Sequence, residues 1–135
     1  MREQIAENLV DTLEDITDPA VQFVTRDSFD PDELSNHQFP AIMVTSSNEE
    51  LVEDHFSGTE TVQVSYALEC YVKGDLLDEA RNELIDAVRD KLYEDRHRDN
   101  NAINTKVASV EIDDGSIAPI GGAMIVVNVT YDYGA

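Results

Sequence analysis

The sequence of 135 residues contains one cysteine, no tryptophan and no long hydrophobic run. A single cysteine, Cys70, excludes an internal disulfide, and its place on the apolar face of a predicted strand favours a buried thiol over a nucleophile. The longest apolar stretches, such as 124–127, are far shorter than the roughly 20 residues that a membrane-spanning helix needs. The N-terminus carries no signal-peptide core, so we expect a protein that is made and used in a cytoplasm-like space.

Basic residues are also scarce, because nine Lys and Arg stand against 29 Asp and Glu and give a formal net charge of −20. This balance argues against a surface that binds nucleic acid. The acids are dispersed through the chain rather than collected in a tail, a pattern that resembles the proteins of halophiles that accumulate salt. At about 1 M salt the screening length falls to roughly 3 Å, so repulsion among dispersed acids largely disappears. An ordinary acidic protein that needs a basic partner is the alternative.

The residue patterns of enzymes are missing as well. His37, His55 and His97 lie in three separate polar stretches without a second ligand at metal spacing, so we expect them to be exposed to solvent. The pair 121–122 is two glycines before a strand, which predicts a bend or bulge rather than a phosphate-binding loop. Neither a Ser-His-Asp nor a Cys-His arrangement has a recognisable context. The sequence therefore predicts a protein that is not an enzyme and has no cofactor or metal site.

The clearest pattern in the chain runs from Thr61 to Leu92. Polar and apolar residues alternate over 61–72, which predicts a strand with one buried face. The apolar positions are Val62, Val64, Tyr66, Leu68, Cys70 and Val72. At roughly 3.3 Å per residue this strand spans about 40 Å, so we expect it to project beyond its own core. After Gly74, Asp75 is a candidate N-cap for an amphipathic helix that continues to Leu92.

Other segments complete the expected order of elements. Apolar residues spaced three or four apart over 5–16 predict a first helix, which Asp18-Pro19 ends. Strands are expected over 21–25, 41–46, 105–112 and 123–133, and the last is apolar on both faces, which is typical of a central or doubly covered strand. The chain predicts an α+β fold in a single domain, 1–135, with a mostly antiparallel sheet and two helices packed on one face.

Polar segments separate these elements. The runs 26–38 and 94–104 predict surface loops, and 113–122 predicts a loop before the closing strand. Arg96, His97 and Arg98 form the only basic cluster. Cations at the end of a helix suit the helix dipole, and we favour that interpretation over a site for an acidic partner.

The segment Asn48–Glu60 joins two strong strands and is longer than a hairpin turn requires. It contains three apolar residues among five acids, and long loops between good strands are often functional. This loop is therefore the segment most expected to carry a contact with a partner. The candidate interface residues are Glu49, Glu50, Leu51, Val52 and Phe56. A solvated loop, with Phe56 folded back onto the core, is the alternative.

The order of elements resembles that of the lambda-like tail terminators, also called tail completion proteins, of tailed viruses. The resemblance rests on FPAIMV before a long hairpin, VQVSYALECYVKG, DEARNELIDAVRDKL and the C-terminal VNVTYDY, and it covers nearly the whole chain. Members of that family are small α/β proteins that form hexameric rings, cap the growing tail tube and join it to the neck. They are not enzymes. The high acidic charge departs from a typical member and suits a virus of a salt-loving archaeon.

The resemblance implies a structural virion protein at the head-proximal end of the tail. It implies a homo-oligomer, a hexamer, whose partners are the tail-tube protein and the neck or connector proteins. DNA is expected to pass through the ring without specific binding, and no membrane is involved. The implied location is the virion tail or neck, after assembly in the host cytoplasm. A neck or stopper ring, a tail-tube subunit, and a small acidic binding or regulatory domain are the alternatives.

Overall fold

The computed structural model describes residues 1–113 and 119–134. Within these residues the chain forms two α-helices, α1 (Arg2–Glu14) and α2 (Leu77–Tyr93), and a sheet of five strands. The strands are β1 (Phe23–Thr25), β2 (Ala41–Asp54), β3 (Glu60–Lys73), β4 (Asn104–Ile112) and β5 (Ile120–Tyr133). Two short 3₁₀ helices, η1 (Pro31–Glu33) and η2 (Asn36–Gln38), lie in the connection between β1 and β2.

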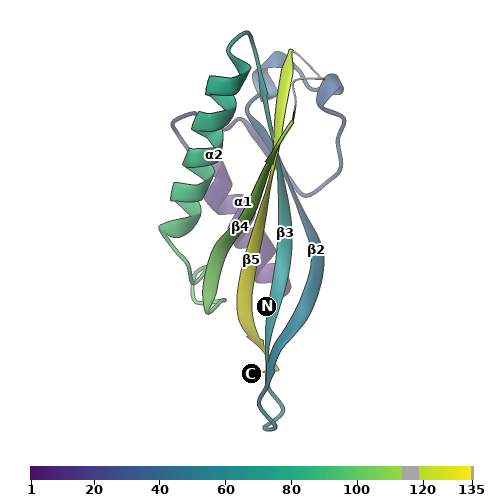
Figure 1. Ribbon diagram of the computed structural model, residues 1–135, viewed down its shortest axis with the longest axis vertical. Coiled ribbons are helices and arrows are strands. Elements are labelled where there is room, and N and C mark those ends of the chain that lie inside the picture. Colours follow the sequence, from purple (N-terminus) through teal and green to yellow (C-terminus); the bar gives the residue numbers. More distant parts are fainter. Residues whose placement is uncertain (114–118, 135) are drawn as a thin grey trace.

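The strands follow the order β1-β2-β3-β5-β4 across the sheet. β1 pairs with β2 in parallel, and the other neighbours pair antiparallel, which confirms the predicted α+β fold with a mostly antiparallel sheet. Because β1 pairs only with 41–43 of β2, the rest of β2 forms one outer edge of the sheet, and β4 forms the other. Figure 1 shows long strands that converge at one end of the molecule.

The core lies between the sheet and the two helices. The apolar residues at the even positions of β3, from Val62 to Val72, are all 5 % exposed or less, so the predicted alternation is confirmed. Leu9 of α1 and Leu84 of α2 belong to the same hydrophobic cluster as these strand residues, and neither has exposed surface. Both helices therefore cover one face of the sheet, as the sequence predicts. Cys70 is buried in this cluster, which raises the pKa of its thiol to about 12.

The helix boundaries differ from the predicted ones. α1 ends at Glu14, although Ile16 beyond it is still buried. The N-cap of α2 is Leu76 and not Asp75, so that prediction is wrong. The amide of Ala80 donates to the carbonyl of Leu76, which makes this the first intrahelical bond and leaves Asp75 one residue too early to cap the helix.

The predicted bend or bulge at the two glycines is also wrong. Gly121 and Gly122 lie inside β5 in unbroken register with Val72 and Tyr71 of β3. A Cβ atom at Gly122 would lie 3.1 Å from a carboxylate oxygen of Asp113, so neighbouring atoms and not backbone bending favour glycine there. β5 consequently begins at Ile120, earlier than expected. Part of the predicted loop over 113–122, residues 114–118, lies outside the described residues.

β5 is central, between β3 and β4, as its apolar character predicts. Its core face is fully buried at Ile125, Val127 and Val129, whereas Met124 and Val126 on the other face are half-buried. On that second face the connection between β1 and β2 packs over one end of the sheet, where the Phe29 ring meets Tyr71 with 5.7 Å between centroids.

Candidate interaction surface on the β2–β3 hairpin

The segment predicted as a loop over Asn48–Glu60 is mostly strand, so that prediction is wrong. β2 continues to Asp54, β3 begins at Glu60, and the pairing runs from Asn48 opposite Ser65 to Asp54 opposite Glu60. The ladder register shifts between Ser46 and Asn48 and again between Leu51 and Glu53. Each shift inserts one extra residue, a β-bulge, and two bulges hide the two-residue alternation by which a strand is recognised in sequence.

The resulting projection, residues 48–65, is named here the hairpin arm. Figure 1 shows that its tip extends past the helices at the end of the molecule where the described C-terminal residues also lie. Every β2 residue from 46 to 54 is exposed. The β3 residues of the arm are more buried, because Val62 and Val64 belong to the hydrophobic core. The arm therefore presents the outer edge and both faces of β2 to solvent.

The base of the arm is anchored through Glu49. Its carboxylate accepts a hydrogen bond from the hydroxyl of Tyr131 and lies 3.7 Å from Nε of Arg2. Burial, followed by the hydrogen bond to Glu49, raises the pKa of Tyr131 above its ordinary value. The hydroxyl of Tyr66 donates to the carbonyl of Arg2 at 3.3 Å. Glu49 thus holds the arm to α1 and β5 and is not a free contact residue.

The other predicted interface residues are exposed. Leu51 and Val52 expose 57 % and 56 % of their surface, and Phe56 at the tip exposes 98 %. The alternative in which Phe56 folds onto the core is therefore wrong. Glu50 is also exposed, pairs with Gln63 across the ladder, and accepts a 3.5 Å hydrogen bond from Asn48. The structure brings the apolar trio of the prediction together on one projection.

Two further apolar residues lie close to the arm. Tyr133 is 56 % exposed and pairs with Glu60, and Met1 is 50 % exposed. Met1 and Tyr133 line one shallow hollow of about 320 Å³ beside the arm. Sequence reasoning missed both as surface residues, because the alternation of the closing strand places Tyr133 on the same face as the buried Tyr131.

The tip of the arm is a defined turn over 55–59. The amide of His55 donates to the carbonyl of Thr59 at 3.1 Å, and the amide of Phe56 donates to the carboxylate of Asp54 at 3.2 Å. Phe56 has a φ of 51° and Gly58 a φ of 93°, both in the left-handed region. These bonds hold the Phe56 ring away from the strands, so the ring is presented outward before any partner arrives.

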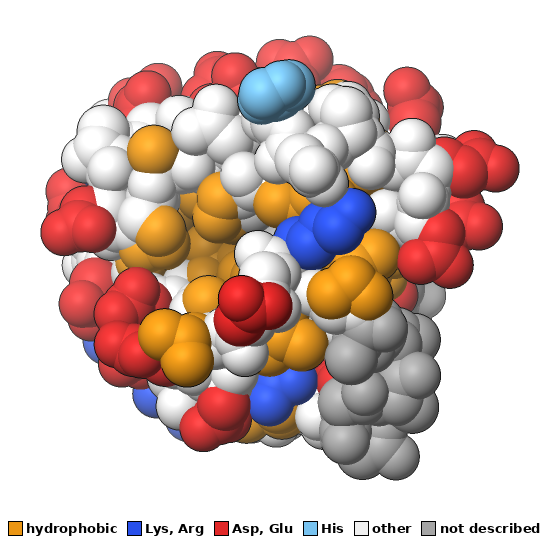
Figure 2. All heavy atoms as spheres, turned by 90° about the horizontal axis from the view of Figure 1, so that it is seen from above, with side chains coloured by type: hydrophobic (Ala, Val, Ile, Leu, Met, Phe, Trp, Pro, Cys, Tyr) orange, Lys and Arg blue, Asp and Glu red, His pale blue; other side chains and the backbone are white. Residues whose placement is uncertain are grey.

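A second surface lies at the opposite end of the molecule. A hollow of about 410 Å³ is lined there by Pro19, Phe39, Pro40, Val72, Ala80 and Pro119, with polar groups from Asn36, Lys73 and Glu83. Figure 2 looks onto this end and shows hydrophobic side chains gathered near its centre, with acidic side chains around the outline. No sequence pattern predicted it, because the lining residues come from five separated segments of the chain.

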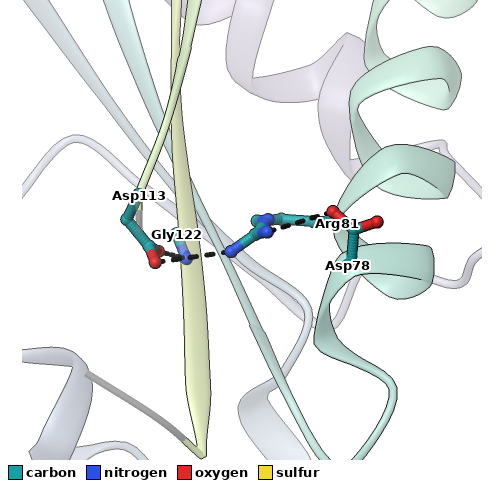
Figure 3. A network of polar contacts seen from close by, with 4 residues as sticks. All are labelled: Asp78, Arg81, Asp113 and Gly122. Carbon is teal, nitrogen blue, oxygen red and sulfur yellow. Dashed lines mark hydrogen bonds and ion pairs between the residues drawn. The ribbon is translucent and has the colours of Figure 1, made fainter. Parts of the chain in front are cut away.

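A polar network around the buried Arg81 ties the elements together near that end (Figure 3). Arg81 of α2 is only 8 % exposed, and its guanidinium donates to Asp78 at 3.2 Å and to Asp113 at 3.3 Å. Asp113 also accepts a hydrogen bond from the amide of Gly122. The network links the first turns of α2 to the end of β4 and the start of β5, which is a structural role.

The basic cluster after α2 is also structural. Arg98 has no exposed surface, and its guanidinium donates to the carbonyl of Leu92 at 2.6 Å and to the carbonyl of Asp95. Arg96 lies over the Tyr93 ring, 4.0 Å from the centroid. Burial lowers the pKa of Arg98, and the nearby Asp95 opposes that shift. The predicted placement of these cations at the helix end is confirmed.

Within residues 1–113 and 119–134, no group of three or more His, Cys, Asp or Glu side chains is arranged to hold a metal ion. His37, His55 and His97 are exposed, as predicted. None of the helices in the part of the chain that the structure describes is long and apolar enough to cross a membrane.

Comparison of the sequence with protein-family models gives no match, and comparison with curated proteins gives no significant match. The resemblance to tail terminators therefore stays a prediction.

Proposed function

We propose that this chain is a subunit of a ring at the head-proximal end of a viral tail, where the ring stops growth of the tail tube and joins the tail to the neck. The observation that carries the proposal is the hairpin arm, a hydrogen-bonded projection with exposed apolar side chains. In this proposal the protein resides in the virion and assembles in the host cytoplasm. The arm contacts a neighbouring subunit and the tail tube.

The apolar residues of the arm support an interface. Leu51, Val52 and Phe56 are each more than half exposed in a chain with a net charge of −20. Burying one such side chain contributes about 1.5 to 3 kcal/mol, and exposed apolar groups gathered on one projection mark interaction sites. The arm is already folded, so its backbone entropy is not lost again when it binds.

The sheet edges support a ring. The outer half of β2 and the whole of β4 lie on opposite edges of the sheet, so one copy presents two different edges to its neighbours. Contacts between two different surfaces of identical subunits are heterologous, and they close into a ring when the rotation between subunits divides a full turn. A hexamer is one such closed arrangement.

The charge fits a channel through which DNA passes. Negative side chains around a lumen repel the phosphate backbone and leave no basic surface to hold it. The scarcity of Lys and Arg therefore suits a ring that DNA crosses without specific binding.

Shortening the arm tests the proposal. Leu51 pairs with Val62, so an Asn-Gly turn in place of residues 52–61 would join two directly opposed residues and keep Glu49 anchored. We expect a folded subunit that does not assemble, and a virus with overlong tails or tails unjoined to heads. Glu53→Gln is the matched control, because it removes a charge from the arm but keeps the apolar trio.

Deletion of the whole protein from the virus separates the alternatives. Loss of the whole tail tube on deletion of the protein would indicate a tube subunit, and tails of normal length without heads would indicate a neck or stopper ring. Normal virions from a virus that lacks the protein would refute a virion role and favour an acidic binding or regulatory domain.

A further inference from the structure

We propose that Phe56 at the tip of one copy inserts into the apolar hollow at the opposite end of a second copy, so that subunits join head to tail. The inference rests on the proposed function in one respect, that the hairpin arm is an interface between subunits. It adds the surface that receives the arm.

The tip has the properties of an inserted side chain. Phe56 is 98 % exposed, and the turn that carries it is held by hydrogen bonds of the His55 and Phe56 amides. An aromatic ring buries about 150 to 250 Å² when it enters a pocket, and a ring held outward in advance loses little freedom on docking.

The hollow has the properties of a receiving pocket. Its volume of about 410 Å³ lies within the roughly 300 to 1,000 Å³ of small-molecule sites, so one aromatic ring and part of its turn fit within it. Its apolar wall includes the ring of Phe39, the side chain of Val72 and the prolines 19, 40 and 119. A phenyl ring that enters from solvent would therefore exchange water for apolar and aromatic contacts (Figure 2).

Charge favours this pairing. Glu53 and Asp54 flank the tip, and Lys73, one of three lysines in the sequence, lines the hollow with its ammonium 5.7 Å from the centre of the Phe39 ring. The acid Glu83 also lines the hollow and works against the attraction. Molar salt screens both the attraction to Lys73 and the repulsion from Glu83, while the apolar contact persists.

The tip that enters a hollow comes from a second copy and not from the same chain. The tip adjoins Glu60, the first residue of β3, and the last residue of β3, Lys73, lines the hollow. The 14 residues of β3, at about 3.3 Å each, separate the tip from the hollow by roughly 40 Å. The tip therefore cannot reach the hollow of its own chain. Because tip and hollow are different surfaces, the contact is heterologous and builds rings or stacked copies.

A mixing experiment tests this directly. In about 1 M KCl, where the screening length is roughly 3 Å, the parent chain is expected to form multimers of its 15.0 kDa subunit. Phe56→Ser removes the ring, and Ala80→Phe or Asn36→Trp fills the hollow, so each variant alone is expected to be monomeric. A mixture of a tip variant and a hollow variant has one intact tip and one intact hollow, and it is expected to give dimers that grow no further.

A disulfide locates the contact. The native Cys70 is buried, so it does not compete in oxidation. Ser57→Cys, an exposed tip position that keeps the Phe56 ring, mixed with Asn36→Cys is expected to give a covalent dimer under mild oxidant. Ser57→Cys mixed with Lys106→Cys, a change on the exposed edge strand β4, is the control and is expected to stay monomeric on a denaturing gel.

Three results would overturn the inference: a parent chain that stays monomeric in molar salt, a Phe56→Ser variant that assembles like the parent, or equal crosslinking of the two cysteine pairs. A Phe56→Ser protein that assembles and rescues the virus would leave the ring proposal standing without this contact. Normal virions without the protein would refute the ring proposal itself, whatever the purified chain does.

Discussion

Leu84 lies where α2 meets the sheet, and its side chain has no exposed surface. Leu84→Asp would place an unpaired carboxylate in the core and remove an apolar contact, which we expect to cost about 4 kcal/mol or more. That is most of a typical stability of about 5 to 15 kcal/mol. Thermal unfolding followed by circular dichroism in molar salt measures it. Glu83→Ala on the exposed side is the control, with an expected change within about 0.5 kcal/mol, and equal melting temperatures would contradict the burial of Leu84.

Cys70 predicts a pH dependence at the scale of one residue. Burial raises the pKa of its thiol to about 12, whereas an unfolded thiol ionises near pH 8.5. Between these values the unfolded chain has lost a proton that the folded chain keeps, so stability is full below about pH 8.5 and falls as pH rises.

The expected slope is about 1.4 kcal/mol per pH unit at pH 9.5 to 11. Cys70→Ala removes this contribution and leaves those of the tyrosines, so urea unfolding of the two proteins should show a steeper decline for the parent. Parallel curves would mean that the thiol ionises as easily in the folded chain as in the unfolded one.

At the scale of elements, Arg98 joins the end of α2 to α1. Its guanidinium donates to the carbonyl of Leu92 and, at 3.4 Å, to the hydroxyl of Thr12. Hydrogen bonds from charged groups contribute about 1.5 to 3 kcal/mol each, so Arg98→Ala should lower the free energy of unfolding by about 3 kcal/mol or more. Arg96 is exposed and its guanidinium lies over the Tyr93 ring, so losing that contact in Arg96→Ala should cost about 1 kcal/mol or less. Denaturant unfolding measures the free energy of unfolding of both variants. A larger loss of stability for Arg96→Ala than for Arg98→Ala would contradict the structural role of Arg98.

At the same scale, the edge strand β2 has features that hinder unspecific pairing with other strands. β2 leaves β1 after residue 43 and continues as an exposed edge to Asp54. Its two bulges and the carboxylates of Glu49, Glu50 and Glu53 hinder unspecific pairing with another strand, because bulges increase local twist and like charges repel. These features protect the exposed edge of β2 from unspecific strand pairing.

At the scale of the molecule, a net charge of −20 predicts stability that rises steeply with salt. The screening length is about 10 Å at 0.1 M and roughly 3 Å at 1 M, so repulsion among dispersed acids decreases over this range. A relief of about 3 kcal/mol would raise the melting temperature by roughly 10 °C. Melting curves in KCl measure this. Asp86→Asn with Asp90→Asn, on the exposed face of α2, should weaken the dependence, and a melting temperature that does not change with salt would contradict it.

The sequence by itself determined the layered core. Alternation over 61–72 and the apolar stripes of the two helices specified which faces are buried, because burying those faces is the main favourable contribution to folding and leaves a periodic trace in the chain. The burial of Cys70 and the cations at the end of α2 followed from the same local rules.

Tertiary structure alone decided the two surfaces on which function is proposed. The bulges near Ser47 and Val52 disrupt the alternation of β2, and its outer half forms because β3, held by β5 on its other side, offers hydrogen bonds to it. Those bonds depend on the backbone of a distant strand, so no local pattern records them. The hollow near Phe39 and Ala80 exists only where five separated segments meet, and the space between packed segments has no sequence signature.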